Sequence, residues 1–163
     1  MSSLTLFCFG EDGNLLVRRN FTASELAARK TTFSLPRPAA GQSVDFYAIG
    51  NTAVGSDVTT KAALLALAET APSTYNGTFS DVTSKSLRSG GFLMSGYATQ
   101  TIESGDTPTQ VAITLKRDVA KIAVQTSLSS DFSSRYPGAV KITSAKISRA
   151  ASQTPYFTGT AKP

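Results

Sequence analysis

The sequence predicts a mainly β fold, a two-sheet β-sandwich of about seven strands with one short helix. Three observations predict it. Short apolar or alternating runs recur along the 163 residues, turn residues separate them, and one stretch has the composition of a strong helix former. Hydrophobic residues make up 40% of the chain and charged residues 17%, as in a folded domain, so we expect residues 1–163 to form a single domain.

Residues 4–9 are apolar on both faces, which predicts a strand in the middle of a sheet that is covered on both sides. Residues 10–14 contain two glycines, which adopt positive φ without strain, and predict a turn. Residues 15–17 are then the second strand of a hairpin. One face of the first strand carries Leu4, Leu6 and Cys8, and the other carries Phe7 and Phe9.

The next segments predict a short helix and two strands. We expect Ser24 to cap a helix that runs through Ala28. Residues 32–35 predict a short strand that Pro36 ends, because proline cannot continue a ladder. Residues 43–49 alternate and predict a further strand. Its two faces carry Val44, Phe46 and Ala48 on one side and Asp45, Tyr47 and Ile49 on the other.

The clearest helix is expected from residue 59 or 60 to residue 70, where alanine and leucine give high helix propensity and Pro72 follows the end. Leu64, Leu67 and Ala68 share one face of this helix. Because the stretch is short and has few cations, we expect it to lie across an open sheet edge rather than on a membrane.

The second half of the chain begins with a long polar loop at residues 73–91. Four further strands are expected at residues 92–94, 111–115, 119–126 and 140–147. In the last of them the alternation changes phase, which predicts a β-bulge near Thr143 and Ser144.

The formal net charge of +5 is spread along the chain. No basic stripe is interleaved with aromatic residues, so we predict no nucleic-acid binding. No apolar run reaches the length of about 20 residues that spans a bilayer, and the N-terminal residues lack the pattern of a signal peptide.

Residues able to carry chemistry are scarce. The chain has no histidine, its carboxylates are isolated, and its single cysteine, Cys8, sits in an apolar strand where a buried, inert thiol is expected. Asp12 lies in a turn that lacks the alternating oxygen ligands of a calcium site, and Ser89 lacks the strand–helix elbow that exposes a nucleophile. We therefore predict a non-enzymatic protein with no catalytic, metal-binding or cofactor-binding residues.

Three segments, in order, resemble the N-terminal domain of the fimbrillin superfamily, the type V pilus subunits of Bacteroidales. They are LTLFCFGEDG at residues 4–13, FYAIGN at 46–51, and FLMSG at 92–96 followed by the strand at 111–115 and by RDVAKI at 117–122. The resemblance covers about residues 4–148 and implies a transthyretin-like sandwich. The motif residues also have structural interpretations: the alternation at residues 119–126 places Ala120 and Ile122 in the core and Lys121 toward solvent, and Gly96 is expected to end or bend a strand.

The resemblance further implies a structural subunit of a cell-surface fimbria, assembled with other pilin subunits by donor-strand exchange and acting in adhesion or biofilm formation. Family members are exported through the outer membrane as lipoprotein precursors, and only that lipid anchor would contact a membrane. Their lipidated cysteine, their first strand and their second β-domain lie outside residues 1–163, so we expect an N-terminal-domain fragment. A sandwich without one strand exposes an apolar groove that a strand from a neighbouring subunit can fill.

Two alternatives stay open at this point. The protein is an anchor or tip adhesin within the same family, or it is a monomeric surface module that binds a glycan or a host protein through residues 73–91. For the second alternative the loop offers two aromatic residues, Tyr75 and Phe79.

Overall fold

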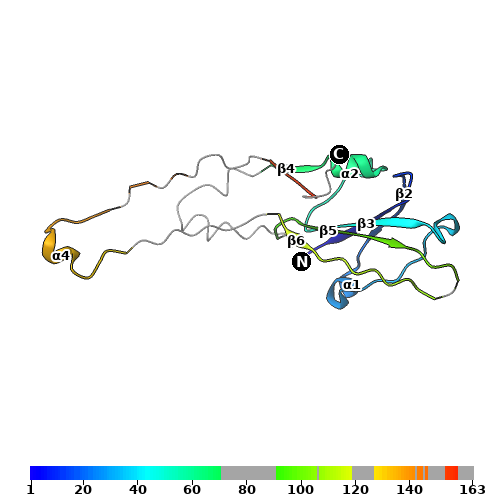
Figure 1. Ribbon diagram of the computed structural model, residues 1–163, viewed down its shortest axis with the longest axis horizontal. Helices are drawn as coiled ribbons and strands as arrows, with labels where there is room; N and C mark the ends of the chain where they lie inside the picture. Colours follow the sequence, from blue (N-terminus) through cyan, green and yellow to red (C-terminus); the bar gives the residue numbers. More distant parts are fainter. Residues whose placement is uncertain are drawn as a thin grey trace.

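The computed structural model describes residues 1–70, 91–105, 107–118, 127–141, 143–144, 146 and 153–157 (Figure 1). Within these residues the fold is mainly β, as predicted, with seven strands in two antiparallel sheets. The larger sheet has the order β2-β1-β3-β5-β6, made by Leu15–Asn20, Leu4–Phe9, Ser43–Gly50, Met94–Thr101 and Lys116–Arg117. The smaller sheet pairs β4, Ala68–Thr70, with β7, Gln153–Pro155.

Strand β1 lies inside the larger sheet and is buried on both faces, as its apolar sequence predicts. The alternation of β3 is also confirmed, and the two strands together supply side chains to two separate cores. The α2-side core consists of Phe7, Phe9, Tyr47, Ile49, Val54, Val58, Leu64, Leu93 and Phe157. The α1-side core, on the opposite face, consists of Leu4, Leu6, Cys8, Ala39, Val44, Phe46 and Ala48.

The hairpin of β1 and β2 contains a bulge. Cys8 pairs with Val17 but Phe9 pairs with Leu15, so Leu16 is the extra residue of β2. A regular strand would send Leu16 to the opposite face from Val17. With the bulge, both side chains pack against the α1-side core, while Leu15 packs against the α2-side core.

Helices α1 and α2 cover opposite faces of the larger sheet (Figure 1). Helix α1 spans Ala23–Ala28, and its N-cap is Thr22 rather than the predicted Ser24. Thr22 and Glu25 form a reciprocal capping box, which satisfies two amide groups that a serine at position 24 would leave unpaired. A 3-10 turn, Arg37–Ala39, precedes β3, and helix α4, Phe132–Arg135, lies away from the sheet in Figure 1.

The expected helix up to residue 70 is too long. Helix α2 spans only Lys61–Leu65, capped by Thr60, and residues 68–70 form β4 instead. The pairing of β4 with β7 overrides the high helix propensity of these residues. Helix α2 covers a sheet face, not an edge, because Leu64 is fully buried in the α2-side core.

Two further strand predictions are wrong. Residues 32–35 and 111–115 are extended but belong to no ladder, and only the following Lys116 and Arg117 pair with β5. Gly96 does not end a strand, since it lies inside β5 opposite Ala48. The described residues between 140 and 146 form no strand. The predicted strand at 119–126, the core roles of Ala120 and Ile122, and the outward Lys121 lie outside the described residues.

Candidate strand-binding groove

A groove of about 2280 Å³ runs along the α1 side of the larger sheet. Its floor is the sheet itself, where Leu4, Leu6 and Phe46 present apolar side chains with less than a tenth of their surface exposed. Residues 29–37 and the described residues of 102–115 line the rest of the groove together with α1; their stretches 31–35 and 110–115 are called the two extended segments. In the following, this hollow is called the α1-side groove.

The two extended segments share the alternation of a half-buried strand. Phe33 and Leu35 from the first, and Val111, Ile113 and Leu115 from the second, pack against the α1-side core, and the residues between them are exposed. The sequence therefore predicts the correct pattern at both places. Neither segment is part of a ladder within the described residues.

The backbone of these segments is unpaired. No residue at 31–35 or 110–115 takes part in a backbone–backbone hydrogen bond with any residue that the structure describes. Extended chain with free N–H and C=O groups next to an apolar floor is the arrangement that accepts an added strand. An incoming strand can pair with these segments and bury every second side chain against the floor.

A polar clip holds the first segment to the sheet. Glu25 accepts hydrogen bonds from Thr31 and Arg19, both at 2.5 Å, and from the backbone N–H of Thr22 at 2.8 Å. The hydroxyl of Thr31, the amide of Thr22 and the guanidinium of Arg19 lower the pKa of Glu25 to about 2. The clip thus joins strand β2, helix α1 and the start of the extended segment.

The second segment crosses closely over β5. A Cβ atom added at Gly96 would collide with the carbonyl oxygen of Thr114. Gly96 is therefore a packing glycine, which permits residues 113–114 to approach the sheet. The Gly in FLMSG was visible in the sequence, but the partner at Thr114 was not.

Asn51 ties three strands together at one end of the larger sheet. Its carboxamide oxygen accepts from the Ser2 N–H at 2.8 Å, and its amide donates to the Phe92 carbonyl at 2.7 Å. Its backbone has φ of 65°, a conformation that asparagine tolerates better than most residues. The Gly-Asn pair that ends FYAIGN is thus a structural joint, and sequence reasoning identified it only as a strand end.

Cys8 and Asp12, which were examined as possible catalytic or metal-binding residues, lie in a core and in a turn. Cys8 is fully buried in the α1-side core, and burial raises the pKa of its thiol to about 12. Asp12 accepts hydrogen bonds from the backbone and side chain of Asn14, which lower its pKa and close the turn. Ser89, Tyr75 and Phe79 lie outside the described residues.

Among the residues that the structure describes, no three His, Cys, Asp or Glu side chains gather where a metal ion would bind. Within the same residues, no helix has the length and apolar character needed to cross a membrane. The α1-side groove is a large, apolar-floored hollow, and it suits an extended peptide rather than a reacting small molecule.

The crystal structure of a fimbrial assembly protein from Parabacteroides distasonis resembles the chain with a TM-score of 0.45 and 16% sequence identity. The match covers 72% of this chain and 46% of that protein, so the chain spans less than half of its length. No curated protein matched the sequence significantly.

A family model matches the whole chain, residues 1–163. The matching family is described as the fimbrillin-A associated anchor proteins Mfa1 and Mfa2. The chain belongs to this family of fimbrial proteins.

Proposed function

We propose that this protein is a structural subunit of a cell-surface fimbria and that the α1-side groove receives a strand from a neighbouring pilin subunit. The observation that carries the proposal is the groove itself, an apolar sheet face flanked by two extended segments that form no backbone–backbone hydrogen bond with the described residues. Family membership supports the fimbrial role, and the groove supports the mode of assembly.

The energetics favour a long-lived joint. Burying one large apolar side chain contributes about 1.5–3 kcal/mol, and an alternating strand would bury several of them in the groove. Pairing along the walls would also satisfy backbone groups that are expensive to leave unpaired once water is excluded. Assembly by this route needs no catalytic residue, which fits a non-enzymatic role.

Within this proposal residues 1–163 act as the N-terminal pilin domain of the subunit, with a transthyretin-like topology. The subunit reaches the surface as a lipoprotein precursor, through the outer membrane, and functions in adhesion or biofilm formation. Among the roles in a fimbria, the description of the family favours that of an anchor over that of a stalk or tip subunit.

The proposal is tested with two peptides of about ten residues, a length that spans about 33 Å when extended. In the first peptide valine and threonine alternate; the second has the same composition with the valines in one block. Hydrogen–deuterium exchange is measured with and without each peptide. We expect the alternating peptide to slow exchange at residues 31–35 and 110–115, and the block peptide to leave these amides unchanged.

Two matched variants locate the binding. Ile113→Asp places a charge on a half-buried wall residue and is expected to weaken the alternating peptide by at least about tenfold. Leu65→Asp changes a half-buried residue at the α2-side core and should leave the affinity as it was. Protection confined to other strands, or equal loss in both variants, would contradict the proposal.

The alternative of a monomeric binding module at residues 73–91 has no observation to favour it, since residues 71–90 lie outside the described part of the chain.

A further inference from the structure

A second, smaller hollow lies on the opposite side of the larger sheet, between its β5–β6 edge and strand β7. It has a volume of about 530 Å³, within the range of sites for small molecules. We call it the Tyr97 hollow. Its lining is Ser95, Gly96, Tyr97, Ala112, Thr114, Lys116, Arg117, Asp118, Thr154 and Phe157.

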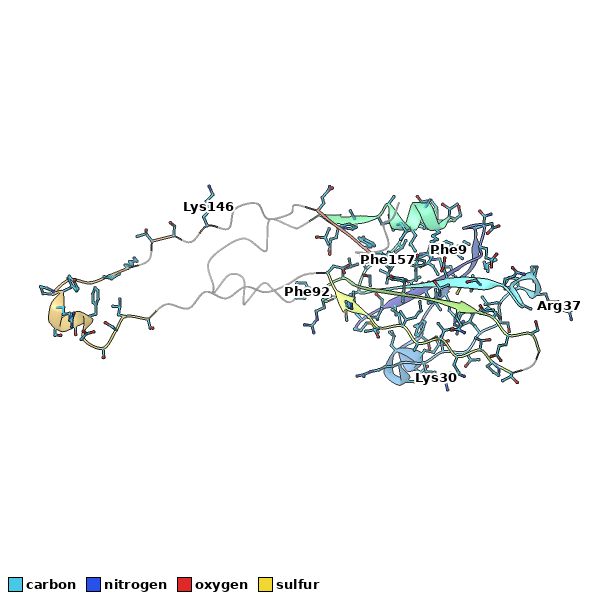
Figure 2. All side chains as sticks on the ribbon, viewed as in Figure 1. Phe9, Lys30, Arg37, Phe92, Lys146 and Phe157 are labelled. Atoms are coloured by element: carbon cyan, nitrogen blue, oxygen red, sulfur yellow. The ribbon has the colours of Figure 1, made fainter. Side chains whose placement is uncertain are left out.

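Tyr97 provides a rigid aromatic surface in this hollow. Its ring stacks on Tyr47 at 5.8 Å with an interplanar angle of 20°, and 49% of Tyr97 is exposed. Tyr47 is in turn held by the edge of Phe157 at 4.9 Å, in the layer between β4 and the larger sheet (Figure 2). A half-exposed aromatic ring that is fixed from behind offers a flat apolar face at little cost in conformational entropy.

Polar side chains surround that surface. The register of β5 and β6 places Lys116 opposite Ser95, so Lys116 lies on the same face of the sheet as Tyr97. Thr114 is exposed beside it, and Thr154 adds a hydroxyl from β7. Hydroxyl groups that are spaced around an aromatic face match a ligand that has one apolar face and a hydroxylated rim.

The charged side chains that line the hollow differ in whether they have hydrogen-bond or ion-pair partners. Lys116 and Arg117 are exposed, and neither forms an ion pair with a residue in the described ranges. The one lining carboxylate, Asp118, accepts a hydrogen bond from Ser95 at 3.2 Å, and its other oxygen is buried away from solvent. The accessible charge of the hollow is therefore positive, which favours a ligand with an anionic group.

The hollow is unsuited to an added strand. Its floor is a sheet face made of side chains, and the main chain at Ser95 and Lys116 is already paired. In its lining Ala112 and Thr114 lack backbone pairing among the described residues, but both belong to the segment that borders the α1-side groove. Side chains alone favour a compact ring-shaped ligand.

We infer that the Tyr97 hollow binds an acidic saccharide, with a pyranose ring on the face of Tyr97 and the sugar carboxylate on Lys116. The site shares Ala112 with the α1-side groove, but Tyr97 and Lys116 lie on the opposite face of the sheet, and the site does not depend on strand exchange. It gives a subunit the means to hold an acidic glycan while its other face is engaged in assembly.

The experiment uses methyl β-glucuronide and methyl β-glucoside, which differ only in the carboxylate. Each is titrated into the labelled protein at physiological salt, and the amide shifts are followed by NMR. We expect the glucuronide to shift amides at residues 95–97 and 112–118 and to bind about tenfold more tightly than the glucoside. An absence of shifts in these segments with the glucuronide would overturn the proposal.

Variants separate stacking from charge. Tyr97→Ala should weaken the glucuronide about tenfold, whereas Tyr97→Phe, which keeps the ring and the stack on Tyr47, should retain binding. Lys116→Ala should reduce the glucuronide to the affinity of the glucoside. Unchanged binding in Tyr97→Ala would overturn the site, and loss in Tyr97→Phe would overturn the stacking role.

Matched controls are available elsewhere in the chain. Tyr136 is 61% exposed outside the hollow, and Lys30 is an exposed cation beside α1, on the other side of the sheet (Figure 2). Tyr136→Ala and Lys30→Ala should leave the titration unchanged. Weakening in either control would show that the sugar binds through nonspecific charge or exposed aromatic surface, and would contradict the proposal.

Discussion

The two faces of the larger sheet are both apolar, yet they are closed in different ways. On the α2 side, Leu64 from helix α2 and Phe157 beside β7 are buried against the sheet, and β4 pairs with β7 above it. On the α1 side, the covering residues are only partly buried, and the extended segments that carry most of them have no ladder. One face is closed by buried side chains, and the other is covered by side chains that are only partly buried.

The difference teaches that burial and pairing are separate requirements. Side chains of residues 31–35 and 111–115 already cover much of the α1-side core, so the hydrophobic effect is largely satisfied there. Their backbone groups form no backbone–backbone hydrogen bond within the part of the chain that the structure describes. An added strand would pair with them in a ladder.

The largest expected effect comes from a substitution in the α2-side core. Phe9→Ala removes a fully buried ring of the α2-side core and should lower the free energy of unfolding by about 3–5 kcal/mol. Phe33→Ala removes a half-buried ring over the groove and should cost only about 1 kcal/mol. Urea denaturation measures both; equal losses would show that the groove wall is packed as tightly as the core.

Gly96→Ala tests how closely the second segment lies on the sheet. The added methyl group would collide with the Thr114 carbonyl, so the segment must move, at a cost of about 1–3 kcal/mol in unfolding free energy. Gly138→Ala is the control, because a Cβ there meets nothing within 4 Å. Thermal unfolding and amide exchange at residues 110–115 measure the change. A neutral Gly96→Ala variant would mean that this segment does not rest on β5.

Asp118→Asn removes the free-energy cost of burying an ionised carboxylate on the α2 side of the sheet. Burial raises the pKa of Asp118, with a smaller contribution from Glu69, so ionisation at neutral pH is unfavourable in the folded state. The variant should therefore be more stable at pH 7, by about 1 kcal/mol because the group is only partly buried. The advantage should shrink as the pH falls and Asp118 takes up a proton. Urea midpoints at pH 7 and pH 4 measure it; a constant difference would contradict the assignment.

The smallest effect concerns the clip that holds the groove wall. The pKa of Glu25 is lowered to about 2, so its contribution is present above its ordinary value of 4.5 and is lost as the pH falls toward 2. Glu25→Gln should lower the urea midpoint at pH 7 and change it little at pH 2. Glu103→Gln is the exposed control. A similar loss at both pH values would indicate that the clip acts through packing rather than charge.

The sequence predicted what depends on local pattern. The burial of β1 on both faces, the alternation of β3 and the half-buried periodicity of residues 111–115 all follow from apolar spacing. The Thr22–Glu25 capping box also has a local sequence pattern, Thr-x-x-Glu at the start of the helix. The prediction of Ser24 as the N-cap overlooked this pattern.

What the sequence could not predict depends on residues that are distant along the chain. Residues 68–70 have helix propensity, but their strand form is decided by pairing with residues 153–155. The lack of a ladder at residues 31–35 depends on the absence of a neighbouring strand, which no local pattern records. A groove was expected from the family resemblance, but the residues that form its walls were not predicted.

Cys8 gives this protein an internal reporter. It is the single thiol of the chain, it lies in the α1-side core beneath the groove, and its high pKa keeps it unreactive while that core is closed. A thiol reagent can therefore react only when this core opens, and the rate of labelling counts those openings. Filling of the groove would be recorded as slower labelling, without any substitution or attached probe.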